Sequence, residues 1–162
     1  MLSCENNYRI MKITKTILLF AAAFMLMTVS CKKSNNKPAT VAVSMTFKFN
    51  GTAQTTKLLV ATYYKSQATV QIAGTNGAQG LSLMIQNPKT GTFDMATDQT
   101  LLLSYSSAAD FDHTYVASTG KVVITTFSST NIAGTFSFSG TDGLGDAGAV
   151  TEGSFSANLI TQ

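Results

Sequence analysis

The sequence predicts an all-β domain, folded as an antiparallel β-sandwich or a closed β-barrel of about eight to ten short strands. Three observations support this fold class. Apolar and polar residues alternate in many short runs, which is the period of a half-buried strand. Turn-forming residues separate these runs at intervals of about 8–14 residues. Thr, Ser, Gly, Val and Phe are abundant, whereas charged residues make up only 12% of the chain, a composition typical of exported β-domains.

Residues 11–30 have the features of a cleaved signal peptide. Lys12 and Lys15 give a positively charged start, and an apolar segment follows over residues 17–29. A helix of this length spans about 20 Å, which is less than the ~30 Å hydrocarbon core of a membrane. We therefore expect a signal peptide and not a membrane-spanning helix. Residues 1–10 add nothing that a signal needs, so we expect Met11 to be the true start.

The leader ends at Cys31, in the sequence Thr28-Val29-Ser30-Cys31. This stretch resembles the lipobox of bacterial lipoproteins, in which a small residue precedes a cysteine that receives a lipid, although Thr28 stands where leucine is usual. Exported proteins normally pair their cysteines, and no second cysteine follows Cys31. We expect lipid attachment at Cys31 and anchoring of the protein in a membrane. The alternative is an ordinary secretory signal followed by a stray cysteine.

Residues 31–40 are polar, contain Pro38 and predict a flexible, lipid-anchored tether before a single β-domain over residues 41–162. Lysines directly after the cysteine resemble a periplasm-facing lipoprotein more than a surface-exported one. The chain has a net charge of +3, but residues 41–162 hold five lysines and seven acidic residues, a net charge of −2, and no arginine. A nucleic-acid partner is excluded because it requires a clustered basic face.

The first strand is expected at residues 41–49, where Val43, Met45 and Phe47 share one face and Lys48 lies on the other. Asn50-Gly51 then gives the strongest hairpin signal of the chain. Further alternating runs occur at residues 69–74, 81–86, 101–106, 113–118, 121–127, 134–140 and 154–160. The predicted turns between them are Thr75-Asn76-Gly77, Asn87-Pro88, Thr119-Gly120 and Asp142-Gly143. After residue 40 no apolar stripe is long enough for a substantial helix.

Two acidic stretches contain residue types that can bind a metal ion. Asp110, Asp112 and His113 have suitable ligand types, but neighbouring strand residues point to opposite faces, so we interpret them as a polar loop. Asp142 and Asp146 lie in a glycine-rich stretch that lacks the spacing and closing glutamate of a calcium loop. We interpret this stretch as a hairpin loop and expect no metal.

No catalytic constellation is evident. His113 is the only histidine, and no G-x-S-x-G elbow occurs, so we expect no enzyme activity, no catalytic residue and no cofactor. Tyr63, Tyr64, Tyr105 and Tyr115 could form a stacking platform for a ligand. Core packing with one exposed tyrosine is the interpretation that we favour, because the chain has no Trp.

Residues 66–86, 91–95, 115–140 and 150–159 together resemble a family of small Bacteroidetes lipoproteins classed as a domain of unknown function. The resemblance is carried by a G-T-F turn at Gly91, by G-x-V-x-I and I-x-G-T-F-S-F patterns at Gly120 and Ile132, and by a closing E-G-S-F strand at Glu152. Glu152 stands where such relatives often have Asn, at an expected turn. The resemblance implies an all-β lipoprotein and assigns no binding or catalytic residue.

These observations lead to an expectation about function. We expect a lipid-anchored protein of the bacterial cell envelope, in the outer membrane and facing the periplasm, which acts as a non-enzymatic binding or structural module. Its expected contact with the membrane is the lipid on Cys31. The alternative is a lipocalin-like carrier of a small apolar ligand. A packed interior with an exposed aromatic patch would favour the first interpretation, and a closed pocket lined by Phe and Leu would favour the second.

Overall fold

The computed structural model describes residues 42–97, 100–107 and 112–162. The predicted leader, the tether, Cys31 and Asp110 lie outside the described residues. No helix in the described ranges has the length and apolar character needed to span a membrane.

Ten strands make up the β-domain. In chain order they are β1 (Ser44–Phe49), β2 (Thr52–Thr55), β3 (Leu58–Tyr64), β4 (Thr69–Asn76), β5 (Gln79–Gln86), β6 (Gly91–Asp94), β7 (Leu101–Ser106), β8 (Thr114–Phe127), β9 (Asn131–Thr141) and β10 (Ala147–Thr161). Within the described part of the chain, the only helical element is a 3-10 turn at Lys65–Gln67. The predicted all-β fold is confirmed.

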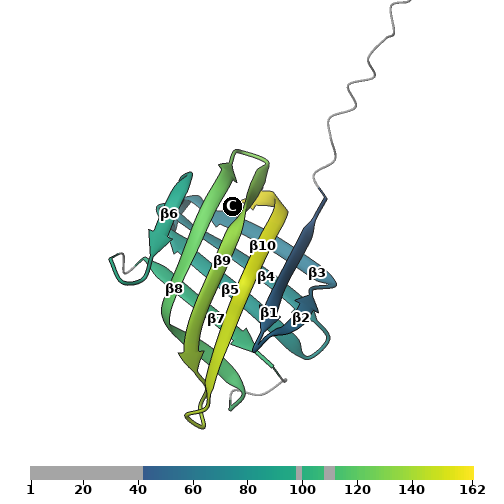
Figure 1. Ribbon diagram of the computed structural model, residues 1–162. Coiled ribbons are helices and arrows are strands. Elements are labelled where there is room, and N and C mark those ends of the chain that lie inside the picture. Colours follow the sequence, from purple (N-terminus) through teal and green to yellow (C-terminus); the bar gives the residue numbers. More distant parts are fainter. Residues whose placement is uncertain (1–41, 98–99, 108–111) are drawn as a thin grey trace, which may run out of the picture. The chain divides into compact units, whose positions relative to one another are not determined.

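Seven of the strands close into a barrel, in the order β3-β4-β5-β7-β8-β9-β10 and back to β3. All neighbours are antiparallel except the closing pair, in which β10 runs parallel to β3 with Leu159 opposite Ala61. Of the two predicted architectures, the structure has the closed barrel and not the sandwich. Figure 1 shows the long strands β8, β9 and β10 crossing in front of β4, β5 and β7.

The three remaining strands widen the barrel wall at two of the long strands. One edge of β10 pairs with β1 along Val150–Ser156 and then with β3 at Leu159–Thr161. One edge of β8 pairs with β7 and then with β6 in the same way. The strand β9 pairs along its length with both β8 and β10. The long strands β8, β9 and β10 therefore form the most extensively paired part of the wall.

The inward positions follow the predicted alternation. Phe155, Ala157 and Leu159 of β10 are buried, as the sequence pattern indicated, and so are Met45 and Phe47 of β1. In β9 the buried positions alternate without a break from Ile132 to Gly140. Inward-facing aliphatic and aromatic side chains from every strand of the closed ring join one core.

One predicted turn is wrong. Thr119-Gly120 lies inside β8, so the two runs at residues 113–118 and 121–127 form a single strand of 14 residues. The pairing of β8 with β9 shifts register beside Thr119 and again between Ile124 and Thr126. Such bulges bend a strand and increase its twist. Gly120 therefore belongs to a bend of the barrel wall and not to a chain reversal.

Two other expected turns are strand residues. Gly91 begins the short strand β6, and Glu152 lies within β10, which carries one extra residue relative to both β1 and β9 at this point. The φ angle of Glu152 is +52°, in the left-handed region that Asn enters more easily than Glu. The bulge at Glu152 needs this left-handed conformation within a continuous strand. It thus explains why Asn, a residue typical of turns, is common at this position in the family that the sequence resembles.

Ala68 ends the 3-10 turn in the left-handed region, with a φ angle of +46°. Replacing Ala68 with Gly is expected to raise the free energy of unfolding by roughly 0.5 kcal/mol, because glycine has no Cβ to oppose this conformation. Ala73→Gly, at an ordinary strand position of β4, should lower the free energy of unfolding by roughly 0.5–1 kcal/mol. Chemical denaturation of both variants checks the opposite signs. A loss of stability in Ala68→Gly would contradict the prediction.

Candidate functional site

The inward-facing side chains of the described residues pack against one another inside the barrel. The ring centroids of Phe47 and Tyr105 lie 5.3 Å apart in an edge-to-face contact, and Phe136 packs against both Phe47 and Phe155 at 6.2 Å. At one end, beside Tyr105, a cavity of about 10 Å³ remains. Such a space holds about one water molecule.

The outer surface of β8, β9 and β10 carries the candidate site. Two shallow grooves, of about 330 Å³ and about 350 Å³, meet at Lys121 and Ser137. We call them together the hydroxyl groove, because most of the outward side chains that line it carry hydroxyl groups. These hydroxyl residues are Thr119, Thr135, Ser137, Ser139, Thr151 and Ser154.

The sequence places these hydroxyls by alternation and by one bulge. In β9 the inward residues Phe136 and Phe138 alternate with exposed Thr135, Ser137 and Ser139. In the ladder between β9 and β10, Phe138 pairs with Val150 and Phe136 with Gly153, so the bulge of β10 lies opposite Ser137. The bulge interrupts the ladder where the two grooves meet.

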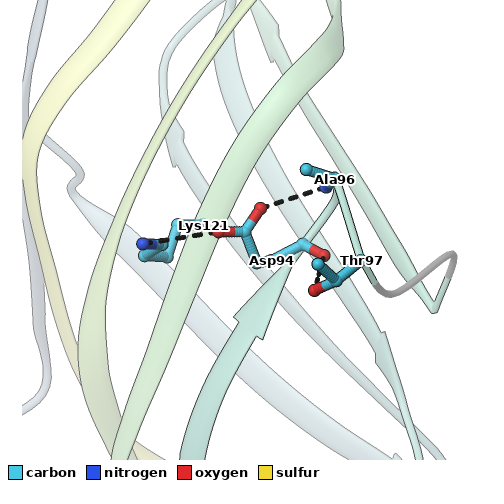
Figure 2. A network of polar contacts seen from close by, with 4 residues as sticks. All are labelled: Asp94, Ala96, Thr97 and Lys121. Atoms are coloured by element: carbon cyan, nitrogen blue, oxygen red, sulfur yellow. Dashed lines mark hydrogen bonds and ion pairs between the residues drawn. The ribbon is translucent and has the colours of Figure 1, made fainter.

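An ion pair with a hydrogen-bonded carboxylate borders the groove on the side of β6. The Ala96 N–H donates to Asp94 Oδ1 at 3.0 Å, and Lys121 Nζ lies 3.4 Å from Asp94 Oδ2, as Figure 2 shows. The hydrogen bond from Ala96, followed by the contact with Lys121, lowers the pKa of Asp94 below its ordinary value. Thr97 donates its hydroxyl to the Asp94 carbonyl oxygen at 3.4 Å and supports the same turn.

A second ion pair lies on the side of β1. Lys48 Nζ contacts Glu152 Oε1 at 2.8 Å, and both side chains are well exposed. An exposed pair of this kind contributes about 0–1 kcal/mol to stability. The hydroxyl groove therefore presents hydroxyl groups together with both signs of charge. Such a surface can form hydrogen bonds with a polar, extended ligand.

The candidate metal ligands do not converge within the described part of the chain. No group of three or more His, Cys, Asp or Glu residues is placed there to hold a metal ion. Asp112 and His113 are exposed in the segment before β8. The backbone carbonyl of Asp112 accepts a hydrogen bond from the Gly143 N–H at 3.2 Å, so this segment lies against the loop between β9 and β10.

Asp142 organises that loop through its side chain. Its Oδ1 accepts hydrogen bonds from the backbone N–H groups of Leu144 at 3.0 Å and Asp146 at 2.8 Å. Its Oδ2 is buried and has no hydrogen-bond partner among the described residues. The interpretation of this stretch as a hairpin loop agrees with the geometry, because the carboxylate serves the turn itself.

The tyrosines do not form a platform. Tyr105 is 1% exposed and belongs to the core, and Tyr63 packs edge-to-face on Phe127 at 5.7 Å. Tyr115 packs on Phe49 at 4.8 Å. Burial, and then the negative charges of Asp142 and Asp146, raise the pKa of Tyr115 above its ordinary value. Tyr63, Tyr105 and Tyr115 thus pack in or against the core, as the sequence interpretation favoured. Tyr64 is half-buried, so none of the four is the exposed tyrosine that this interpretation included.

The hydroxyl groove was not found from the sequence. The alternation of Ser and Thr with Phe in β9 was visible, but any solvated strand face shows the same pattern. What distinguishes this face is the bulge opposite Ser137. It could have been suspected only from Glu152-Gly153 within an otherwise regular strand pattern.

The comparisons with known proteins give the family and nothing about activity. No curated protein and no solved structure matches the chain. A family model matches residues 59–157, from β3 to β10, which is more than half of the sequence. The chain therefore belongs to the DUF6252 family, a domain of unknown function.

Proposed function

We propose that this protein is a lipid-anchored module of the bacterial cell envelope that binds a partner at its surface and catalyses no reaction. The filled barrel with a hydroxyl groove on its outer wall carries this proposal. A carrier of small apolar ligands would share the closed barrel, but a cavity of about 10 Å³ is far below the roughly 300–1,000 Å³ of a ligand pocket. The packed interior favours surface binding.

The anchor rests on the leader and on Cys31, the lone cysteine that follows its apolar segment. A diacylglyceryl group and an additional acyl chain bury many methylene groups at about 0.8 kcal/mol each, so the attachment is effectively permanent. We place the protein in a Bacteroidetes-like outer membrane, facing the periplasm, on the resemblance of its leader and tether to those of such lipoproteins.

Replacing Cys31 with Ala tests the anchor. The full chain, expressed in a bacterial host that lipidates exported proteins, is expected to leave the membrane fraction and the detergent phase when the acceptor thiol is removed. Cys4→Ala is the matched control, because it removes the other cysteine of the chain, and its partitioning should not change. Retention of Cys31→Ala in the detergent phase would rule out the lipid anchor.

The ligand class follows from the hydroxyl groove. Hydroxyls that both donate and accept, with Lys121 and Glu152 among them, suit an extended polymer that carries hydroxyls, amides and both signs of charge. Peptidoglycan is an envelope polymer with these groups. We propose that the groove binds it, and insoluble sacculi serve as the probe.

Replacing Ser137 with Tyr tests this binding. The bulky ring fills the point where the two grooves meet, so the affinity for sedimented sacculi is expected to fall about tenfold, equivalent to ~1.4 kcal/mol. Thr52→Tyr places the same side chain on exposed β2, outside the groove, and should bind as the unsubstituted chain does. Equal binding by all three proteins, or no binding by any, would reject the groove as a peptidoglycan site.

A further inference from the structure

The barrel wall opposite the hydroxyl groove has an unusual outer surface. Outward residues of β3, β4, β5 and β7 pair across the strands in continuous rows. One row runs Val60-Ala73-Ser82-Ser104-Val116, and the next runs Ile160-Thr62-Gln71-Met84-Leu102. We call the outward positions of these four strands, with Val116 and Ile160, the charge-free face, since none of them is Lys, Arg, Asp or Glu. Two of these outward residues, Thr62 and Thr69, are buried.

Large aliphatic side chains are exposed at both ends of these rows. Val60 is 51% exposed and Val116 is 49% exposed at the two ends of the first row, and Ile160 and Leu102 are each 52% exposed at the ends of the second row. Between the ends lie small residues, among them Ala73 and Ser82. Exposed aliphatic residues gathered on one face of a soluble domain mark an interaction surface. The strip of small residues leaves room for the aliphatic side chains of a partner.

We propose that this charge-free face binds a second copy of the same chain. In a two-fold interface the residues near the axis face their own copies, so a charge at that point meets a like charge. The charge-free face avoids that cost at every register. The outer surface of β8–β10 would instead have to desolvate Lys121 and Glu152.

The size of the face is consistent with a reversible dimer. Four strands about 4.8 Å apart and four rows about 6.7 Å apart give roughly 500 Å² per copy, compared with about 800 Å² per partner in a stable complex. A lipid surface is a less suitable partner, because anionic lipids attract Lys and Arg and this face has neither. The inference does not depend on the ligand of the hydroxyl groove or on the anchor.

Cysteine cross-linking of the full chain in whole cells tests the proposal. Ala73→Cys, Ser82→Cys and Ser104→Cys each place a thiol on the middle of the face. At least one of them, close to the two-fold axis, is expected to give an oxidised band at twice the mass of the chain. Ser137→Cys on the opposite wall is the control, and the unsubstituted chain, which has no cysteine after Cys31, sets the baseline. Adding Leu102→Lys should reduce the cross-linked fraction at least fivefold.

Three results would overturn the proposal. They are the absence of a dimer band from all three variants, an equally strong band from Ser137→Cys, or a cross-linked band whose mass is not twice that of the chain. The last result would assign the face to a different protein.

Discussion

Replacing Gly140 with alanine is expected to lower the free energy of unfolding by about 3 kcal/mol or more, and to leave part of the chain unfolded at ordinary temperature. Gly140 is an inward residue of β9, opposite Ala117 at the first bulge of β8. An added Cβ would overlap the carbonyl oxygen of Val116, a backbone atom that cannot rotate away. Overpacking usually costs about 1–3 kcal/mol, and a collision with backbone belongs at or above the upper end.

Gly80→Ala is the matched control for this change. Gly80 lies in β5, and a Cβ built on it meets no atom within 4 Å. The free energy of unfolding of this variant should lie within about 0.5 kcal/mol of that of the unsubstituted protein. Urea denaturation followed by far-UV circular dichroism measures both variants. Similar midpoints for Gly140→Ala and Gly80→Ala would contradict the close approach of β8 and β9.

Truncating Tyr105 to alanine is expected to cost about 3–5 kcal/mol, the range found for large aromatic residues removed from cores. Tyr105 is 1% exposed, and its ring lies 5.3 Å from Phe47 and 4.5 Å from Phe49. It therefore connects β7 with β1 at the end of the barrel where the small cavity beside it lies. Loss of the ring would enlarge that cavity and separate the two strands.

Tyr105→Phe separates packing from the hydroxyl. It keeps the ring contacts, so its cost should stay below about 1.5 kcal/mol. Thermal unfolding followed by circular dichroism compares the two variants. If Tyr105→Phe destabilised the protein as much as Tyr105→Ala does, the hydroxyl group would account for the stabilisation by Tyr105. The prediction that ring packing stabilises the protein would then be wrong.

Local patterns predicted the elements that depend on neighbouring residues. Alternation identified the buried residues Phe155 and Leu159, and Asn50-Gly51 marked the turn between β1 and β2, where both residues have positive φ angles. These signals need only the period of a strand and the chemistry of a tight turn. They do not depend on which strands become partners.

The closure of the barrel and the hydroxyl groove could not be predicted in this way. Barrel and sandwich differ in whether β10 pairs with β3, and that contact joins residues such as Ala61 and Leu159, 98 positions apart. Gly120 has the residue type of a turn, yet it lies inside β8 because the strand must bend there. The hydroxyl groove depends on the same long-range registers, since the bulge of β10 is defined only against β1 and β9.

The parallel contact between β10 and β3 also sets the order in which the protein can fold. The hairpins β4–β5 and β8–β9 join residues close in sequence and can form early, whereas the closing pair must bring together segments separated by most of the domain. Until it forms, the edges of β3 and β10 remain unpaired, and open strand edges are sites of aggregation. We therefore expect barrel closure to be the slow step of folding, and the open barrel to be the species that a chaperone would have to protect.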